Sequence, residues 1–558
     1  MAIIINHKRL AMNKNKPFNI IHFLVLICSV AFISCNPQTR DKEIPKPLPN
    51  ILLIVADDLG YTDLGAFGGE ISTPNLDTLA SQGILFSNFH TAPICAVSRA
   101  MLLSGNDNHI AGMGSMFADS ALSTNWGYER HLSKRILSVP QLMMDAGYHT
   151  YTVGKWHLGE EEENSPKAKG FKRSWNLLQG AGNHYNSIGL SKSGSLYREN
   201  GKFVEYPKGR YSTEFYASKL IEFFKQDKDD ANPFFAFAAF TSPHWPLQAP
   251  DEFVQKYNGK YIAGYDELRQ KRFKSVKAKG IISKDAKLPP KLEELIPWDE
   301  LRADEKLIES RKMELYAGMV DNLDFHVGRM IDSLKSFGLY ENTLIIFMSD
   351  NGADGSDFYN NSPYSEFLHA TYDNTYDNMG RESSFVVYGK PWAHAGMAPF
   401  NRYKTFTTEG GIRSPFLIAG PGVHKKREIS HTYISLLDLA PTFYEIAGVV
   451  YPGKYDSDNI SPLLGASLVS LLSGDSKEIH DEEYISILEH NGRVYVRKGP
   501  WKLVQIDSPF EEEDFILFNL DNDMGETTDL KLEFHEKYQE LLKLYRDYVK
   551  RVQVIPVE

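Results

Sequence analysis

The sequence predicts an α/β fold, in which a large mixed sheet with helices precedes a smaller C-terminal antiparallel sheet with one helix. Four buried strands are expected, at residues 51–55, 148–153, 234–240 and 343–348, and the first, third and fourth are almost wholly apolar, which is typical of strands buried on both faces. Helical patterns lie between them, the longest at 306–337. Near the C-terminus, short strand-like runs at 484–488, 492–497, 501–506 and 515–519 precede a helical stretch at 533–549, which favours an antiparallel sheet closed by a helix.

The composition bounds the domain organisation and the partners. A chain of 558 residues that is 42% hydrophobic and 24% charged is long enough for one large globular domain and a smaller one. We expect the large domain to span residues 50–465 and the C-terminal subdomain to span 466–558. The formal net charge of −11 argues against a nucleic-acid partner, because phosphate backbones select basic surfaces.

The N-terminus has the pattern of an export signal. Basic residues between positions 8 and 16 precede an apolar run at 18–33 that is short for a membrane span. The run ends in Phe-Ile-Ser-Cys35, which resembles a bacterial lipoprotein cleavage box. We therefore expect a signal peptide over 1–35, a lipid anchor on Cys35 and a polar tether over 36–49. The alternatives are a plain secretory signal and an N-terminal anchor helix; all three imply export, to the periplasm or the outer-membrane surface.

Cysteine usage leaves no disulfide in the mature chain. Cys28 would be removed with the signal, and Cys35 would carry lipid. Cys95 is then the only cysteine of the folded part. An exported chain of this size can rely on its core instead.

Oxygen-bearing side chains follow two of the buried strands. Asp57 and Asp58 come directly after the first, and Asp350 and Asn351 after the fourth. Adjacent carboxylates at the end of a buried strand are costly unless a cation neutralises them, although solvated aspartates in a turn are the alternative for the first pair. Four oxygen ligands without sulfur suit calcium or magnesium better than zinc.

Basic side chains follow the other two strands. Lys155 and His157, two apart and bracketed by glycines, come after the second strand and would point the same way in an extended segment. His244 lies between two prolines after the third. The alternative for Lys155 and His157 is that they are solvent-exposed side chains without a role in a site. The alternative for His244 is that it packs in the core beside Trp245.

Residues 95–105 contain the remaining chemistry. Cys95 is followed by Ser98, Arg99 and the sequence Leu-Ser-Gly105, and an apolar helix is expected from residue 99. Residue 95 would then lie near a helix N-terminus, where backbone amides favour negative charge. The alternative is that Cys95 is a small hydrophobic core residue.

Together these motifs resemble the type I sulfatases. Cys-x-x-Ser-Arg with Leu-Ser-Gly resembles the maturation motif of that family, and the strand-end motifs, Lys404 and the segment Glu409–Arg413 follow in family order. Residues 179–184 and 404–413 are most similar to the bacterial arylsulfatase branch. One departure is Val97, where the family usually has proline or alanine. The resemblance implies an alkaline-phosphatase-like fold, with a large mixed-sheet sandwich domain.

The resemblance also implies two groups at the site. Cys95 would be oxidised to Cα-formylglycine (3-oxoalanine) by a formylglycine-generating or sulfatase-maturating enzyme. Ca²⁺, rather than Mg²⁺, would be held by Asp57, Asp58, Asp350 and Asn351 with the modified residue 95.

By the same resemblance, the remaining residues take roles in catalysis. Arg99 would orient the aldehyde hydrate, while Lys155 and Lys404 would bind sulfate. Asp350 would accept the proton of the attacking hydroxyl. His244, helped by Lys404, would protonate the leaving alcohol, and His157 would be the base that releases sulfate by elimination.

Three functions follow from the sequence. The first is a sulfatase that acts on aryl sulfates or on sulfated carbohydrate, including polysaccharide. The second is a phosphonate or phosphodiester hydrolase of the same superfamily. The third is a non-catalytic lipoprotein that binds sulfated glycans and keeps Cys95 unmodified.

Overall fold

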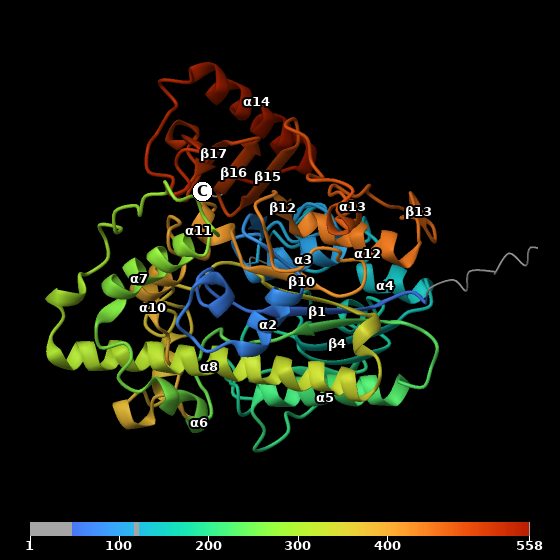
Figure 1. Ribbon diagram of the computed structural model, residues 1–558, viewed down its shortest axis with the longest axis horizontal. Coiled ribbons are helices and arrows are strands. Elements are labelled where there is room, and N and C mark those ends of the chain that lie inside the picture. The colour runs from blue at the N-terminus through green and yellow to red at the C-terminus, as the bar shows by residue number, and fades with distance from the viewer. Residues whose placement is uncertain (1–46, 117–121, 557–558) are drawn as a thin grey trace, which may run out of the picture. The chain divides into compact units, whose positions relative to one another are not determined.

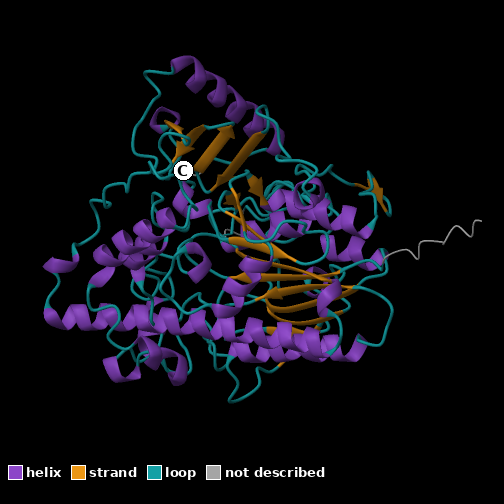
Figure 2. Cartoon of the chain, viewed as in Figure 1, coloured by secondary structure: helices purple, strands orange, loops and turns teal. Residues whose placement is uncertain are grey.

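The computed structural model describes residues 47–116 and 122–556, and its largest feature is a ten-stranded mixed sheet (Figures 1 and 2). The five central strands, β9, β1, β8, β4 and β5, are parallel to one another, and the strands at both edges pair antiparallel or in short ladders. In sheet order the strands are β11 (Glu428–Ser430), β2 (Ile84–Phe86), β10 (Phe416–Ala419), β9 (Thr343–Ser349), β1 (Asn50–Ala56), β8 (Phe234–Ala239), β4 (His149–Lys155), β5 (Arg173–Leu177), β6 (Tyr197–Glu199) and β7 (Lys202–Val204).

The apolar runs form strands because both faces of the sheet are covered. In β1, Leu52 and Ile54 belong to one hydrophobic core, while Ile51, Leu53 and Val55 belong to the other. The first core packs under α2 (Pro74–Gln82), α5 (Ser212–Asp227) and α8 (Ala303–Ser336), and the second under α3 (Cys95–Ser104), α4 (Val139–Asp145) and α12 (Leu439–Ala447). Burial on both faces explains why the run has no polar alternation.

The C-terminal sheet and helix are also present. The antiparallel strands β15 (Ile485–His490), β16 (Arg493–Lys498), β17 (Trp501–Gln505) and β18 (Ile516–Asn519) pair in chain order. The helix α14 (His535–Val552) packs on this sheet through a third core (Figure 1). Residues 48–558 form one compact unit, so the division at residue 465 stays a prediction.

Two segments carry further sequence predictions. Residues 351–401 have no clear periodicity, which predicts one long functional loop, but they contain the helices α9 (Ser365–Thr371) and α10 (Gly389–Gly396). The charge run at 261–290 suggests a guide for an anionic polymer, which stays a prediction, and the stretch contains α7 (Gly264–Ala278). Arg272 of this helix is 1% exposed and binds Glu70 and Asp63, so this side chain serves the core.

The smaller elements complete the chain. They are β3 (Phe89–His90), β12 (Ile434–Ser435), β13 (Lys454–Tyr455), β14 (Asp458–Asn459), α6 (Asp251–Val254), α11 (Glu409–Ile412) and α13 (Val469–Ser473). Within the described residues, no helix has the length and apolar character needed to cross a membrane. The expected signal peptide, Cys28, Cys35 and most of the tether lie outside the described residues.

Candidate active site

The carboxyl ends of β1 and β9 bring the acidic motifs together. These strands are parallel neighbours, and Ala56 lies opposite Ser349, so the residues that follow each strand leave the sheet at one edge. The Asp58 amide donates to Asp350 Oδ1 at 3.4 Å, and Asn351 Nδ2 donates to Asp58 Oδ1 at 2.7 Å. Ligands gather at this edge in open α/β sheets.

Three buried cations neutralise these carboxylates. Lys155, the last residue of β4, places Nζ 2.7 Å from Asp57 Oδ2, and Lys404 places Nζ 2.8 Å from Asp58. Arg99 donates from Nε and Nη2 to Asp350 Oδ2 and from Nη1 to the Lys155 carbonyl oxygen. Arg99 and Lys155 are 0% exposed, so each contact is made away from water.

Cys95 is the first residue of α3, and its Sγ lies 3.4 Å from His157 Nδ1. Burial raises the pKa of the Cys95 thiol, although Lys155 and Lys404 oppose the shift, so the thiol is neutral at pH 7. Burial, and then the charges of Lys155 and Arg99, lower the pKa of His157 well below its usual range. The uncharged His157 imidazole can therefore accept a proton beside residue 95.

His244 faces the same cluster from the end of β8. Its Nδ1 lies 2.7 Å from the Trp245 carbonyl oxygen, which can only accept, so Nδ1 carries a hydrogen. Its Nε2 lies 3.4 Å from Asp58 Oδ2. Burial, followed by the charges of Lys404 and Lys155, lowers the pKa of His244 well below its usual range. The imidazole is therefore neutral, and Nε2 carries a lone pair.

The described residues offer a metal-binding constellation here. Ligand atoms of Asp57, Asp58 and His244 all lie within 4.8 Å of one another. The buried Oδ1 of Asn351 has no hydrogen-bond partner. Burial raises the pKa of Asp58 well above its usual range, and the neighbouring carboxylates add to the rise despite Lys404. An orphaned amide oxygen beside crowded carboxylates fits a hard cation.

The group of Asp57, Asp58 and His244 differs from the expected ligand set, because it includes His244 and leaves out Asp350 and Cys95. His244, expected to act on the leaving alcohol, belongs to the close group, whereas Asp350 gives one oxygen to Arg99. Asp350 Oδ1 nevertheless faces the Asp58 amide, and burial with Asp57 raises the pKa of Asp350. Asp350 therefore lies against the same acidic group.

With all four carboxylates ionised, the cluster has an excess of one negative charge. Its four carboxylates are Asp57, Asp58, Asp350 and Asp354, and its three cations are Arg99, Lys155 and Lys404. Both histidines are neutral by the pKa directions given above. A bound divalent cation would convert the site to one net positive charge, which complements a monoanionic sulfate ester.

Sequence reasoning missed Asp354. Its Oδ2 lies 3.1 Å from Lys404 Nζ and accepts the Trp245 indole N–H at 2.8 Å. The one available signal was its place four residues after Asp350, within a segment interpreted only as a loop.

The backbone is strained beside several site residues. Asp58, His157 and Thr405 have positive φ angles of 67°, 61° and 75°. Such conformations cost about 1–3 kcal/mol each in non-glycine residues and concentrate at functional sites. Gly154, with φ of +93°, precedes Lys155, and a Cβ there would meet the Ala239 carbonyl oxygen at 1.9 Å. Only glycine lets β4 approach β8 so closely.

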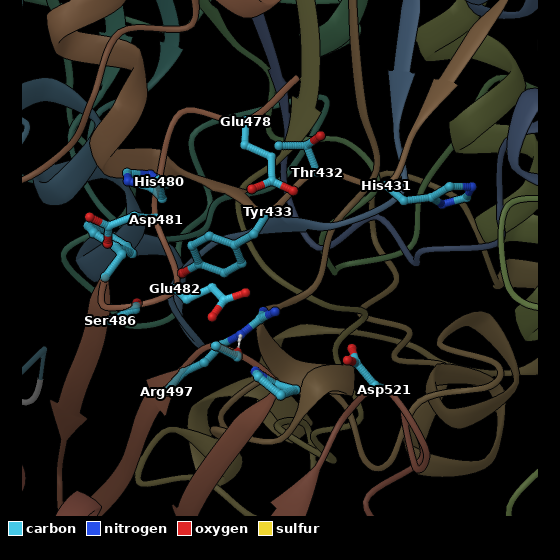
Figure 3. A pocket seen from close by; sticks show the side chains of 13 residues that line it. His431, Thr432, Tyr433, Glu478, His480, Asp481, Glu482, Ser486, Arg497 and Asp521 are labelled. Atoms are coloured by element: carbon cyan, nitrogen blue, oxygen red, sulfur yellow. Dashed lines mark hydrogen bonds between the residues drawn. The ribbon is translucent and has the colours of Figure 1, made fainter. Parts of the chain in front are cut away.

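A separate cavity of about 210 Å³ lies beside the C-terminal sheet (Figure 3). Arg497 lies over the Tyr433 ring, 4.2 Å from its centroid, and Glu478 and Glu482 also line the cavity. Its lining includes none of the expected site residues, so the buried cluster does not open into it.

Comparison with known proteins decides the family. The model of the sulfatase family matches residues 49–449. The chain belongs to the sulfatase family. A second model, described as the C-terminal part of N-sulphoglucosamine sulphohydrolase, matches residues 400–554.

Individual relatives agree. An uncharacterized sulfatase of Schizosaccharomyces pombe is 38% identical over 92% of this chain and 94% of its own. An arylsulfatase of Klebsiella aerogenes is 39% identical over 76% of this chain and 92% of its own. The crystal structure of Ps i-CgsB with k-i-k-neocarrahexaose has a TM-score of 0.64 and 24% identity, and the match covers 90% of this chain and 92% of that one. The protein is thus a sulfuric ester hydrolase with the alkaline-phosphatase-like fold of the family.

Proposed function

We propose that this sulfatase hydrolyses sulfate esters with a formylglycine made from Cys95 and a bound Ca²⁺. One observation carries the proposal: Cys95 begins α3, contacts His157, and is acted on by the charges of Lys155, Lys404, Asp57 and Asp350. The hydrated aldehyde of formylglycine supplies both a nucleophilic oxygen and a second hydroxyl for release of sulfate. A maturation enzyme is therefore a required partner.

The metal would be held by Asp57, Asp58, Asp350 and Asn351 together with residue 95. Ca²⁺ is preferred over Mg²⁺ because calcium accepts many protein oxygens, whereas magnesium keeps several waters. When bound, it supplies charge stabilisation at the sulfate oxygens. The orphaned Asn351 oxygen and the raised Asp58 pKa support this assignment.

The other side chains divide the binding and proton-transfer tasks. Lys155 and Lys404, which are both buried, would bind the sulfate group, and Arg99 would orient the hydroxyls of residue 95. Asp350 would accept the proton of the attacking hydroxyl. His157 Nδ1 would later accept the proton of the second hydroxyl, since it already faces residue 95. His244, helped by Lys404, would protonate the leaving oxygen: its Nε2, which carries a lone pair, would first take up a proton from the Lys404 ammonium and then give it to that oxygen.

For the substrate we propose sulfated carbohydrate, including polysaccharide, with aryl sulfates also cleaved. Two solved structures with this fold carry carbohydrate in their descriptions: Ps i-CgsB with k-i-k-neocarrahexaose, and a protein with its substrate D-glucosamine-2-N,6-O-disulfate. The arylsulfatase of Klebsiella aerogenes supports the aryl sulfates. Release of inorganic sulfate from a panel of defined sulfated sugars and aryl sulfates would rank them.

We further propose that the chain is an exported bacterial lipoprotein, anchored through Cys35 at the periplasmic or outer-membrane surface. The support comes from the sequence alone: the basic residues between positions 8 and 16, the apolar run at 18–33 and the Phe-Ile-Ser-Cys35 box. The N-terminal peptide of protein from membranes should begin at a lipidated Cys35. A Cys35→Ala variant that stays in the membrane fraction with the same N-terminus would contradict the anchor.

The decisive experiment uses protein produced in a host that has the maturation enzyme. Mass spectrometry of the peptide that contains residue 95 is combined with a measurement of turnover on the same protein. We expect the mass of formylglycine and release of sulfate from an aryl sulfate. An intact thiol with no turnover would favour the non-catalytic glycan-binding hypothesis. Faster cleavage of an aryl phosphonate than of the matching sulfate would instead favour the phosphonate or phosphodiester hydrolase.

A further inference from the structure

Asp354 holds two groups at once with one carboxylate oxygen. Oδ2 contacts Lys404 Nζ at 3.1 Å and accepts the Trp245 indole N–H at 2.8 Å, while Oδ1 accepts the Ser356 amide at 2.7 Å. Asp354 is 5% exposed, so both oxygens are committed within the protein. The Lys404 amide also donates to the Ala353 carbonyl oxygen at 3.0 Å, which fixes the backbone of Lys404 beside this loop.

Trp245 connects Asp354 to His244. The indole ring lies 4.2 Å from the imidazole of His244, centroid to centroid, and its backbone carbonyl fixes Nδ1 of the same imidazole. Phe358 stacks on Trp245 at 4.4 Å, with an interplanar angle of 22°. The bond from Trp245 Nε1 to Asp354 therefore fixes the ring that packs against His244.

We propose that Asp354 is a positioning residue, which holds Lys404 and, through Trp245, His244 where the leaving oxygen of the ester is protonated. The inference rests on the proposed function, in which these two side chains serve the leaving alcohol. It assigns to Asp354 no contact with substrate.

The negative charge of Asp354, as well as its hydrogen bonds, contributes to holding Lys404. Burial opposes ionisation of this carboxyl, but the nearby charge of Lys404 lowers its pKa below the usual range, so it is ionised. An ionised Asp354 keeps an ammonium group at Lys404. An asparagine keeps the acceptor for Trp245 and loses the charge partner of Lys404.

Positioning of a proton donor has a specific kinetic signature. Assistance at the leaving oxygen matters most when the alcohol is a poor leaving group, and it matters little for an acidic phenol that departs as an anion. General acid catalysis contributes about 10²–10⁴-fold. We expect Asp354→Asn to lower kcat by less than about 10-fold for a nitrophenyl sulfate and by about 10²-fold or more for phenyl or alkyl sulfates.

The test measures kcat across this series of esters with matured Asp354→Asn, wild-type enzyme and a matched control, Asp357→Asn. Asp357 lies in the same loop, and its carboxylate accepts hydrogen bonds from the Asn360 and Asn361 side chains rather than from site residues, so its variant should follow wild type across the series. A uniform loss for every ester in Asp354→Asn, or no loss, would overturn the proposal. Asp354→Glu, which restores the charge, should recover part of the loss on the poor leaving groups.

A crystal structure of the Asp354→Asn variant gives a readout that does not depend on turnover. Displacement of Lys404 Nζ from residue 354 is expected, and an unmoved Lys404 and Trp245 would overturn the positioning role. Failure of matured wild type to release sulfate from any ester would contradict the proposed function. An active wild type, with a loss in Asp354→Asn that is the same for every leaving group, would contradict only the role of Asp354.

Discussion

The buried amine of Lys502 offers the sharpest test of how the C-terminal sheet supports the site. Lys502 on β17 places Nζ 2.8 Å from Glu409 and 2.8 Å from Glu526, and it is 0% exposed. Glu409 begins α11, five residues after Lys404, and its amide donates to Glu526 Oε2 at 2.7 Å. The amine thus joins the C-terminal sheet to the segment that carries Lys404.

Lys502→Met keeps the volume of the stem and removes the charge. Loss of one partner from a buried ion pair costs about 3–5 kcal/mol, because the remaining charges stay buried without compensation. We therefore expect the free energy of unfolding to fall by about 3–5 kcal/mol at pH 8. Chemical denaturation followed by tryptophan fluorescence measures this change.

The pH dependence of the loss has a defined sign. Burial, and then the charge of Glu409, raise the pKa of Glu526 to about 7, against the effect of Lys502. A carboxyl whose folded pKa exceeds its unfolded value destabilises the fold progressively as pH rises from the unfolded pKa to the folded pKa. Without Lys502 the folded pKa of Glu526 is higher still. Glu526 of the variant therefore takes up its proton at a higher pH, and the variant should recover stability relative to wild type as pH falls from 8 to 6.

Lys498→Met is the matched control. Lys498 lies on the neighbouring strand β16 and also contacts two glutamates, Glu483 and Glu540, but at the surface. Exposed pairs of this kind contribute little to stability. Equal losses in the two variants, or a loss below about 1 kcal/mol for Lys502→Met, would refute the argument from burial.

Three further predictions follow from the cluster and the core. Cys95→Ala should abolish turnover without changing the melting temperature by more than a few degrees, and appreciable residual activity would contradict its role as the nucleophile. Chelation of calcium should lower the melting temperature, since a ligand at 100 times its Kd stabilises by about 2.7 kcal/mol; Asp57→Asn should remove that shift, and an identical shift in this variant would place the metal elsewhere. His394 is buried, and burial with the charges of Arg269 and Arg402 lowers its pKa to about 3. The unfolded chain alone then takes up this proton below about pH 6.5, so wild type should lose about 2–3 kcal/mol more than His394→Gln between pH 6.5 and 4.5, as chemical denaturation would measure; parallel profiles would argue against a neutral buried imidazole.

Much of the fold could be predicted from local pattern. The segments at 51–55, 148–153, 234–240 and 343–348 became β1, β4, β8 and β9. Three of them are almost wholly apolar because both faces of the strand are covered, whereas β4 also buries His149, Thr150 and Thr152. The C-terminal strands and α14 followed from alternation and helical spacing. Residues 351–401 have weak periodicity, and the short helices α9 and α10 there were not predicted.

The site was predicted as a set of residues, and the structure decided how they meet. Asp58 and Asp350 were each expected at a strand end, yet the hydrogen bond between them depends on β1 and β9 being neighbours, which strand order alone settles. Motif order in the chain indicated the chemistry of sulfate esters, because that information lies in residue type and spacing.

The sequence by itself determined the family, the buried strands and the residues with reactive groups. Only the tertiary structure decided that Asp354 joins Lys404 to Trp245, and that Lys502 joins Glu409 to Glu526. Lys404 follows Asp354 by 50 positions, and Lys502 follows Glu409 by 93. No local propensity specifies such pairs, because the free energy of a buried charge depends on which groups the whole fold places around it.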